Sequence, residues 1–231
     1  NGHQVVAEIY PYSFGATIVA ADYLHPDNYK NNMGHTYSDI VETATLKPLT
    51  KERYEYLVKN APFTSVTFKN ASEEVVMDML AQPTVLVGSD AFPYNAKSDG
   101  SIVYDWDTPY DSVNGHPRGA GTHALVLQKV REDKLMPLML AISKMTYMYA
   151  KFLEDNGVSQ MANKGRIQVG ADADITIFDP ATVRQNATVK NGGLPSTGIP
   201  YVVVNGTIVV KDSKVLEGVY PGQPIRAEIT K

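Results

Sequence analysis

The chain has 231 residues, 43% of them hydrophobic and 20% charged, which is enough for one large domain or for a domain with a smaller companion. Its formal net charge is −4 and its basic residues are scattered, which argues against a nucleic-acid partner. The absence of cysteine excludes disulfides, thiolate nucleophiles and cysteine-type zinc sites within this chain, and no apolar run approaches the ~18 residues of a membrane span.

The first six residues carry no basic stretch followed by an apolar one, so they do not resemble a signal peptide. Together with the lack of cysteine, this favours a cytoplasmic location. The sequence runs directly into a strand, and we expect the chain to be one part of a longer protein.

The N-terminal third begins with a strand and continues into polar sequence. Residues 5–12 predict a strand that ends at Pro11, because proline cannot donate to a strand ladder. Residues 13–17 predict a turn, and residues 18–24 a short helix or loop lining. Residues 25–50 are mostly polar and irregular, which is typical of a functional insertion or lid.

Two helices and a short strand are expected next. Thr50 is a suitable cap for a helix that ends at Asn60, residues 65–68 predict a strand, and Ser72 is a suitable cap for a second helix. The apolar residues at helical spacing in the second helix, which we expect to be buried, are Val75, Val76, Met79 and Leu80.

A buried strand is predicted over residues 84–87. This β-branched apolar run lies between Pro83 and Gly88, as in a strand covered on both faces. Ser89 and Asp90 follow at its carboxyl end, where barrels and open α/β sheets place reacting groups. Asp90 is therefore a candidate general base or metal ligand, and the alternative is an aspartate that caps the next turn.

Residues 91–121 predict a long loop that contains Trp106 and the tripeptide His116-Pro117-Arg118. Helices are expected over residues 123–132 and 135–153. The methionines of the second helix are interpreted as adaptable core filling rather than as a cofactor site.

The last ~65 residues predict mainly antiparallel β structure. Residues 165–180 predict two short strands joined by a glycine turn. Residues 201–210 predict a hairpin, because Asn205-Gly206 between apolar runs favours a primed turn. The helix–strand order before this segment gives an α/β fold class.

Several of these motifs occur together in one family. The segment Gly165-Arg-Ile-x-x-Gly-x-x-Ala-Asp-Ile-x-x-Phe-Asp, with the later Val204-Asn-Gly, resembles the C-terminal β-sandwich of the amidohydrolase superfamily. Tyr10-Pro-Tyr, Gly88-Ser-Asp and His116-Pro-Arg-x-x-Gly-Thr resemble the D-aminoacylase branch, the N-acyl-D-amino-acid deacylases. The resemblance covers nearly the whole chain except the polar insertion.

This resemblance implies the C-terminal part of a (β/α)₈ TIM-type barrel plus a small antiparallel β-sandwich domain. Residues 1–160 would hold the last barrel strands and helices, with an insertion at about 25–60, and residues 161–231 would belong to the β-domain. The strand at 5–10 would be the seventh of the barrel and that at 84–87 the eighth. The implied partner is the N-terminal half of the same enzyme, as a separate chain or a missing segment. Homo-oligomerisation is left open.

The implied activity is zinc-dependent hydrolysis of the amide bond of an N-acyl-D-amino acid, with N-acyl-D-glutamate as one candidate. One or two zinc ions are implied, with ligands mostly outside this chain. Asp90 would be the catalytic acid and base and a candidate metal ligand.

The same resemblance assigns substrate contacts. Arg118 would bind the substrate α-carboxylate, with Tyr10 as a phenolic donor and His116 fixing the loop. Much of the family has a serine six residues after the tyrosine. Here that position is Ala16, and Thr17 is the candidate for the hydroxyl contact. Without the resemblance, Arg118 is better explained as a surface arginine in a long loop.

Two other functions remain open from the sequence. A cyclic-amide hydrolase of the hydantoinase or dihydroorotase kind would share the barrel and the aspartate, and a non-catalytic homologue would share the fold alone. The other histidines, which lack the spacing of a metal site, are His3, His25, His35 and His123.

Overall fold

The computed structural model describes residues 4–105 and 107–228, so His3 and Trp106 lie outside the described part. The strands are β1 (Ala7–Ile9), β2 (Phe14–Ile18), β3 (Ile40–Glu42), β4 (Lys47–Pro48), β5 (Ser65–Lys69), β6 (Val85–Val87), β7 (Asn95–Ala96), β8 (Val113–Asn114), β9 (Ile175–Ile177), β10 (Tyr201–Val204), β11 (Thr207–Lys211) and β12 (Lys214–Val215). The α-helices are α1 (Pro26–Met33), α2 (Lys51–Asn60), α3 (Glu73–Ala81), α4 (Arg118–Glu132), α5 (Leu138–Met145) and α6 (Tyr147–Asp155).

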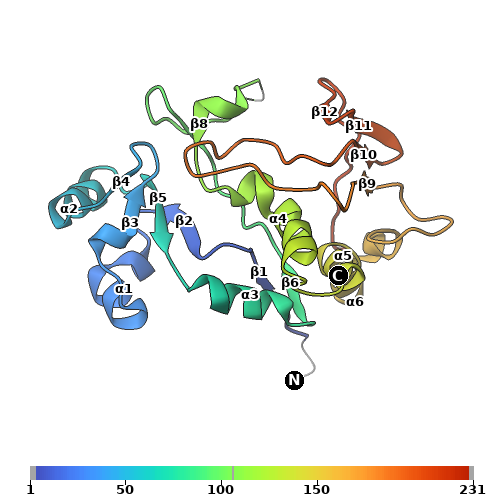
Figure 1. Ribbon diagram of the computed structural model, residues 1–231, viewed down its shortest axis with the longest axis horizontal. Helices are drawn as coiled ribbons and strands as arrows, with labels where there is room; N and C mark the ends of the chain where they lie inside the picture. The colour runs from blue at the N-terminus through green and yellow to red at the C-terminus, as the bar shows by residue number, and fades with distance from the viewer. Residues whose placement is uncertain (1–3, 106, 229–231) are drawn as a thin grey trace.

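The centre of the molecule is a parallel pair of strands, β1 and β6, with α3 and α4 beside them (Figure 1). Both strands were predicted, and they form with shorter bounds than expected. One face of the pair packs Ile9 and Val87 against helices α3, α4 and α5. The buried residues of this cluster are Leu80, Val87, Val126, Met136 and Ala141. Each strand has only the other as partner within the described residues, so each has one unpaired edge.

Residues 14–69 form a compact unit, not the turn and irregular insertion expected from the sequence. Its antiparallel sheet has the order β2-β5-β3-β4, and α1 and α2 belong to the same unit (Figure 1). Residues 13–17 are mostly strand, with Phe14 opposite Lys69 and Ile18 opposite Ser65. This core was not predicted because its strands are short and its aromatic residues are scattered, so the apolar residues show no regular spacing in the sequence. Its buried members are Val19, Leu24, Tyr29, Ile40, Leu49, Tyr54, Leu57, Val66 and Phe68.

The helix caps agree with the predictions. The Thr50 hydroxyl accepts from the Arg53 amide at 3.2 Å, and the Ser72 hydroxyl accepts from the Val75 amide at 3.3 Å. The expected burial of α3 is only half right. Val76 and Leu80 are buried, whereas Val75 and Met79 are 48% and 45% exposed.

The helices after Asp90 differ from the expected bounds. Helix α4 begins at Arg118, five residues earlier than predicted, and the single helix predicted over 135–153 is two helices divided at Thr146. Thr146 has φ −138°, and its hydroxyl donates to the Ile142 carbonyl at 2.8 Å, a bond that competes with the helix ladder. The methionines are not uniformly core filling, since Met136 is buried but Met139 is 70% exposed.

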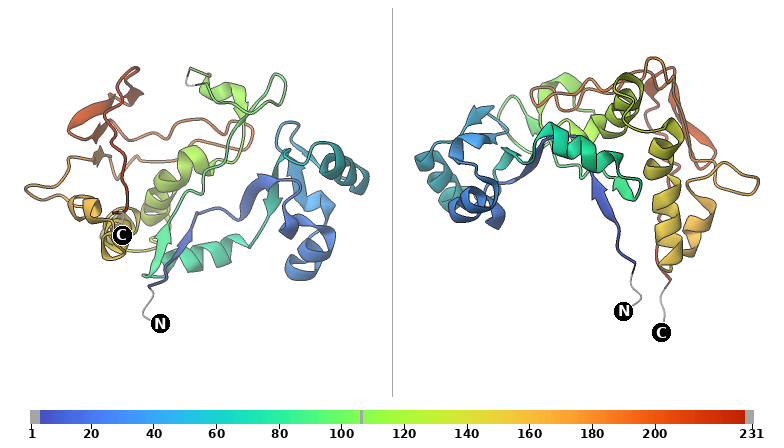
Figure 2. Two further views of the ribbon diagram at one scale, coloured as in Figure 1. Left: turned by 180° about the vertical axis from the view of Figure 1, so that it is seen from behind. Right: turned by 60° about the horizontal axis from the view of Figure 1, so that its bottom comes forward.

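The C-terminal part contains an antiparallel sheet in the order β12-β11-β10-β9, set apart from the insertion in both views of Figure 2. The predicted hairpin is confirmed, and both turn residues, Asn205 and Gly206, have positive φ. Of the two strands expected over 165–180, only β9 forms. Gly165 and Gly170 both have positive φ, and this turns the backbone before β9.

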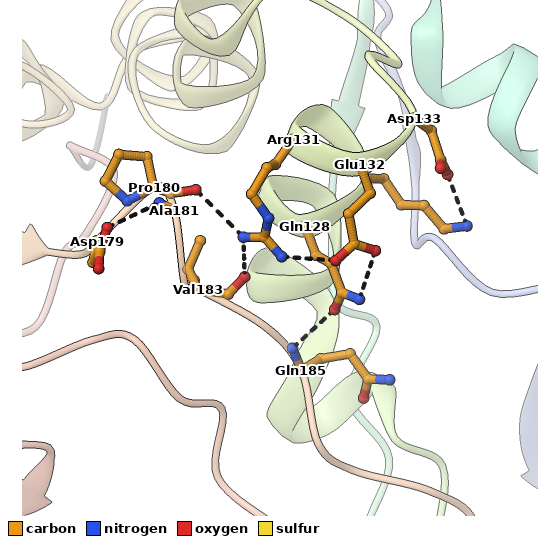
Figure 3. A network of polar contacts seen from close by, with 10 residues as sticks. Gln128, Arg131, Glu132, Asp133, Asp179, Pro180, Ala181, Val183 and Gln185 are labelled. Carbon is orange, nitrogen blue, oxygen red and sulfur yellow. Dashed lines mark hydrogen bonds and ion pairs between the residues drawn. The ribbon is translucent and has the colours of Figure 1, made fainter.

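A polar network joins α4 to the C-terminal segment (Figure 3). Arg131 Nη1 donates to the carbonyls of Pro180 and Val183, at 3.3 and 2.6 Å, and Nη2 pairs with Glu132 at 2.8 Å. The Gln128 side-chain oxygen accepts from the Gln185 amide at 3.4 Å. The network fixes this segment against the helix that begins at Arg118. No helix in the described part of the chain is long and apolar enough to cross a membrane.

Candidate active site

Asp90 lies three residues beyond the end of β6, at the carboxyl end of the parallel pair. Its φ is +45°, in the left-handed region that non-glycine residues rarely adopt. Its side chain is 64% exposed, and Oδ2 pairs with Arg118 Nη2 at 3.0 Å. The carboxylate is thus held at a strand end and remains open to a ligand.

Arg118 is the first residue of α4, and its side chain is only 2% exposed. Besides Asp90, Nη2 reaches the Ala16 carbonyl at 3.2 Å, and the guanidinium lies over the Tyr10 ring at 4.6 Å. The Nε donor is buried and has no acceptor among the described residues. A buried guanidinium needs such partners, because an unpaired buried charge is costly.

His116 ties the loop before α4 to the start of β2. Its Nδ1 accepts from the Arg118 amide at 3.0 Å, so the ring proton is on Nε2, which donates to the Phe14 carbonyl at 2.7 Å. Burial lowers the pKa of His116 to about 4, with a further lowering by the Arg118 charge, against the opposing effect of the Phe14 bond. His116 is therefore neutral near pH 7, and it holds both Arg118 and β2.

Aromatic rings enclose this histidine. Phe14 stacks on it at 4.3 Å, and Tyr12 meets it edge-on at 5.1 Å. Burial raises the pKa of the Tyr12 phenol, whose OH donates to the Pro117 carbonyl at 3.5 Å. Gly121 is needed here, since a Cβ at that position would lie 2.7 Å from the Tyr12 oxygen. The rings keep water from the His116 hydrogen bonds.

The structure brings together four of the five site residues predicted from the sequence: Asp90, Arg118, His116 and Tyr10. The Thr17 hydroxyl makes no hydrogen bond within the described part of the chain, and its contact with a substrate stays a prediction. The neighbouring Ala16 accepts from Arg118 through its backbone carbonyl.

Two clefts border Asp90, and both are also lined by Glu8 and Gly88. The cleft on the side of Tyr10 and Met79 measures about 350 Å³. The other, on the side of His123 and Tyr149, measures about 550 Å³. Glu8 was not predicted as a site residue, although a carboxylate among the apolar residues of a predicted strand was a usable signal.

The described residues do not form a zinc site by themselves. No three His, Cys, Asp or Glu side chains converge within 4–105 and 107–228. His25 caps α1 through a bond from the Asp27 amide, and His35 Nε2 lies 3.2 Å from the Asn70 carbonyl. Asp90 can supply one carboxylate ligand at most.

The fold and site define an α/β protein whose polar residues gather at the carboxyl end of parallel strands. The chain belongs to the amidohydrolase family, whose model matches residues 34–210. It is 35% identical over 138 residues to an N-acyl-D-glutamate deacylase of Alcaligenes xylosoxydans xylosoxydans, covering 59% of this chain and 24% of that protein. It is 31% identical over 160 residues to a D-aminoacylase of the same organism, covering 69% of this chain and 28% of that protein.

Solved structures agree with this membership. The N-acyl-D-glutamate deacylase of Bordetella bronchiseptica, complexed with zinc and a phosphonate inhibitor, aligns with a TM-score of 0.71 at 27% identity, covering 98% of this chain and 43% of that one. A crystal structure of a D-aminoacylase aligns with a TM-score of 0.70 at 25% identity, over 94% and 42%. The chain thus spans 24% and 28% of the length of the two curated relatives.

Proposed function

We propose that this chain is the catalytic-aspartate part of a metal-dependent enzyme that hydrolyses the amide bond of N-acyl-D-amino acids. The products are a carboxylate and a free D-amino acid. The support is family membership, together with similarity to two kinds of N-acyl-D-amino-acid deacylase.

In this proposal β1 and β6 are the seventh and eighth strands of a (β/α)₈ barrel. Their parallel pairing and the helices packed on one face support it. The earlier strands and most zinc ligands come from the N-terminal half of the enzyme, as a separate chain or a further segment. The unpaired edges of both strands are where that half would add.

One observation carries the proposal: Asp90 is exposed at the strand end while a buried arginine holds it. Amide hydrolysis needs a base that takes a proton from water and an acid that gives one to the leaving nitrogen. An exposed carboxylate fixed at Oδ2 by Arg118 can do both in turn. Asp90 takes that role here.

Arg118 and Tyr10 are proposed to bind the substrate α-carboxylate. The support is that Arg118 Nη2 already orients Asp90 and that the guanidinium lies over the Tyr10 ring, so the three side chains are next to one another. An arginine that contacts both Asp90 and the substrate α-carboxylate would place the scissile amide next to the base. His116 positions the arginine through its backbone amide.

The substrate subtype proposed is an acidic D-amino acid such as N-acyl-D-glutamate. The support is the 35% identity to a relative of that name. The side-chain carboxylate of such a substrate requires a positively charged residue in addition to Arg118. That residue would come from the half of the enzyme beyond this chain.

The test is an assay of the complete protein with N-acetyl-D-glutamate, its L-enantiomer, a neutral N-acetyl-D-amino acid and hydantoin. We expect acetate release from the D-substrates alone. Ring opening of hydantoin would favour a cyclic-amide hydrolase, and no turnover by a folded, metal-loaded protein would favour a non-catalytic homologue.

The variant that tests the role of Asp90 is Asp90→Asn. Loss of the base should reduce kcat by at least about 100-fold while leaving the fold intact. Asp78→Asn, a matched change of an exposed aspartate on α3, should keep full activity. Substantial turnover by Asp90→Asn would remove Asp90 from the mechanism.

A further inference from the structure

Glu8 places a second carboxylate beside the strand end that carries Asp90. It lies between Ala7 and Ile9 in β1 and pairs in register with Leu86 of β6. Successive residues of a strand point to opposite faces, and Ile9 packs into the core with Val87. The Glu8 side chain therefore leaves the opposite face of the pair, away from the hydrophobic cluster.

A tyrosine from a distant element fixes this carboxylate. The Tyr149 OH, on α6, donates to Glu8 Oε2 at 2.8 Å. Burial and the Glu8 carboxylate both raise the pKa of the Tyr149 phenol, so it keeps the proton that makes this bond. A side chain with three free torsions is thus held in one place.

The Glu8 carboxylate lies against the backbone of Gly88. A Cβ built on Gly88 would lie 2.8 Å from Glu8 Cδ and Oε2 and 3.0 Å from Oε1. A side chain at Gly88 would therefore have to displace the Glu8 carboxylate from its bond to Tyr149. Gly88 has no positive φ, so close approach, not backbone conformation, favours glycine here.

The backbone two residues further on needs support. Asp90 has φ +45°, which costs about 1 kcal/mol for a non-glycine residue and persists only where the surroundings impose it. Arg118 holds the Asp90 side chain. The contact between Glu8 and Gly88 supports the segment from the strand side.

We propose that Glu8 is a positioning residue for Asp90: held by Tyr149, it packs against Gly88 and fixes the turn that presents the catalytic carboxylate. The inference rests on the proposed function of Asp90. It assigns to Glu8 a role of shape and hydrogen bonding, without a proton transfer or a metal contact.

The test is a set of variants in the complete protein, measured for kcat, KM and melting temperature. Glu8→Ala removes the support, and we expect kcat to fall about 10- to 100-fold with KM within about twofold, since small misplacements of reacting groups have effects of this size. Glu8→Gln keeps an oxygen that accepts from Tyr149, so it should retain most of the activity. Tyr149→Phe should give an intermediate loss.

Gly88→Ala provides the decisive comparison. Its Cβ would meet Glu8, so kcat should fall, and the double variant Glu8→Ala/Gly88→Ala should be no worse than Glu8→Ala alone. A crystal structure of Gly88→Ala should show Asp90 displaced, and one of the double variant should show it nearer its original place.

Three outcomes would overturn the inference: unchanged kcat in Glu8→Ala, Glu8→Gln as inactive as Glu8→Ala, or fully additive losses in the double variant. A protein without deacylase activity would refute the proposed function instead. The crystallographic position of Asp90 in these variants would still test the support by Glu8.

Discussion

At the scale of single residues, the site is a chain of contacts that ends at one carboxylate. His116 holds the Arg118 amide, and Arg118 holds Asp90. In each contact the donor group belongs to a buried residue. Without the contact the donor would be unsatisfied, which is costly for a buried polar group. The exposed Asp90 side chain is therefore ordered by residues that are themselves 1–2% exposed.

The neutrality of His116 predicts a pH dependence of stability. Its pKa is about 4 in the folded protein, below the ~6.5 of an unfolded chain, so the unfolded state binds the proton first as pH falls. This stability is present above about pH 6.5 and is lost as pH falls towards 4. By pH 4.5 the loss should be about 2 kcal/mol.

Urea unfolding of the wild type and of His116→Gln at pH 7, 5.5 and 4.5 measures this effect. Glutamine keeps a donor for the Phe14 carbonyl but does not titrate. The variant should be less stable at pH 7 and should lose less stability on acidification, because it lacks the titrating histidine. Acid effects on the carboxylates are common to both proteins and cancel when the two are compared. Parallel curves for the two proteins would assign the acid sensitivity to other groups.

Contacts of single residues were predictable from the sequence where a motif contains the side chain. They were not predictable where a backbone atom makes the contact. Asp90, Arg118, His116 and Tyr10 follow from their motifs and meet in space. The bond from Arg118 to the Ala16 carbonyl was not predicted, because no pattern of side chains can indicate a contact made by a backbone atom.

At the scale of elements, capping and turn chemistry were predictable because each depends on a few adjacent residues. The caps at Thr50 and Ser72 and the Asn205-Gly206 turn all formed. The unit of residues 14–69 was not predicted. Its sheet is held by contacts such as Phe14 with Lys69, which are distant in sequence and leave no local period.

The network of Figure 3 predicts that α4 and the C-terminal segment are stabilised together. Arg131→Ala would leave the carbonyl of Val183, a residue with 0% exposure, without its charged donor. We expect a loss of about 1–2 kcal/mol in the free energy of unfolding.

Urea unfolding of Arg131→Ala beside Lys151→Ala is the measurement. Lys151 makes a surface pair with Asp155, and its loss should cost less than about 0.5 kcal/mol. Equal effects in the two variants would mean that the bonds to Pro180 and Val183 contribute no net stability.

At the scale of the whole molecule, the parallel pair at its centre lacks strand partners on its outer edges. Strands β1 and β6 bond only to each other within the described part, and Val5, just before β1, is 89% exposed. In the sheet β2-β5-β3-β4, in contrast, the inner strands β5 and β3 are paired on both sides, and the buried cluster is made of residues from the same unit. Strand pairing is therefore the feature in which the two units differ.

In the proposed enzyme, we therefore expect the N-terminal half to protect β1 and β6 but not the unit of residues 14–69. Unpaired strand edges exchange their amide hydrogens quickly, and pairing slows that exchange. Hydrogen exchange of the 231-residue chain alone, compared with the complete protein, should show the amides around β1 slowed about 100-fold or more by the added strands. Val66 and Phe68 in β5, buried within the unit of residues 14–69, are the internal control and should exchange equally in both. Equal rates at β1 in the two proteins would contradict the placement of its free edge against further barrel strands.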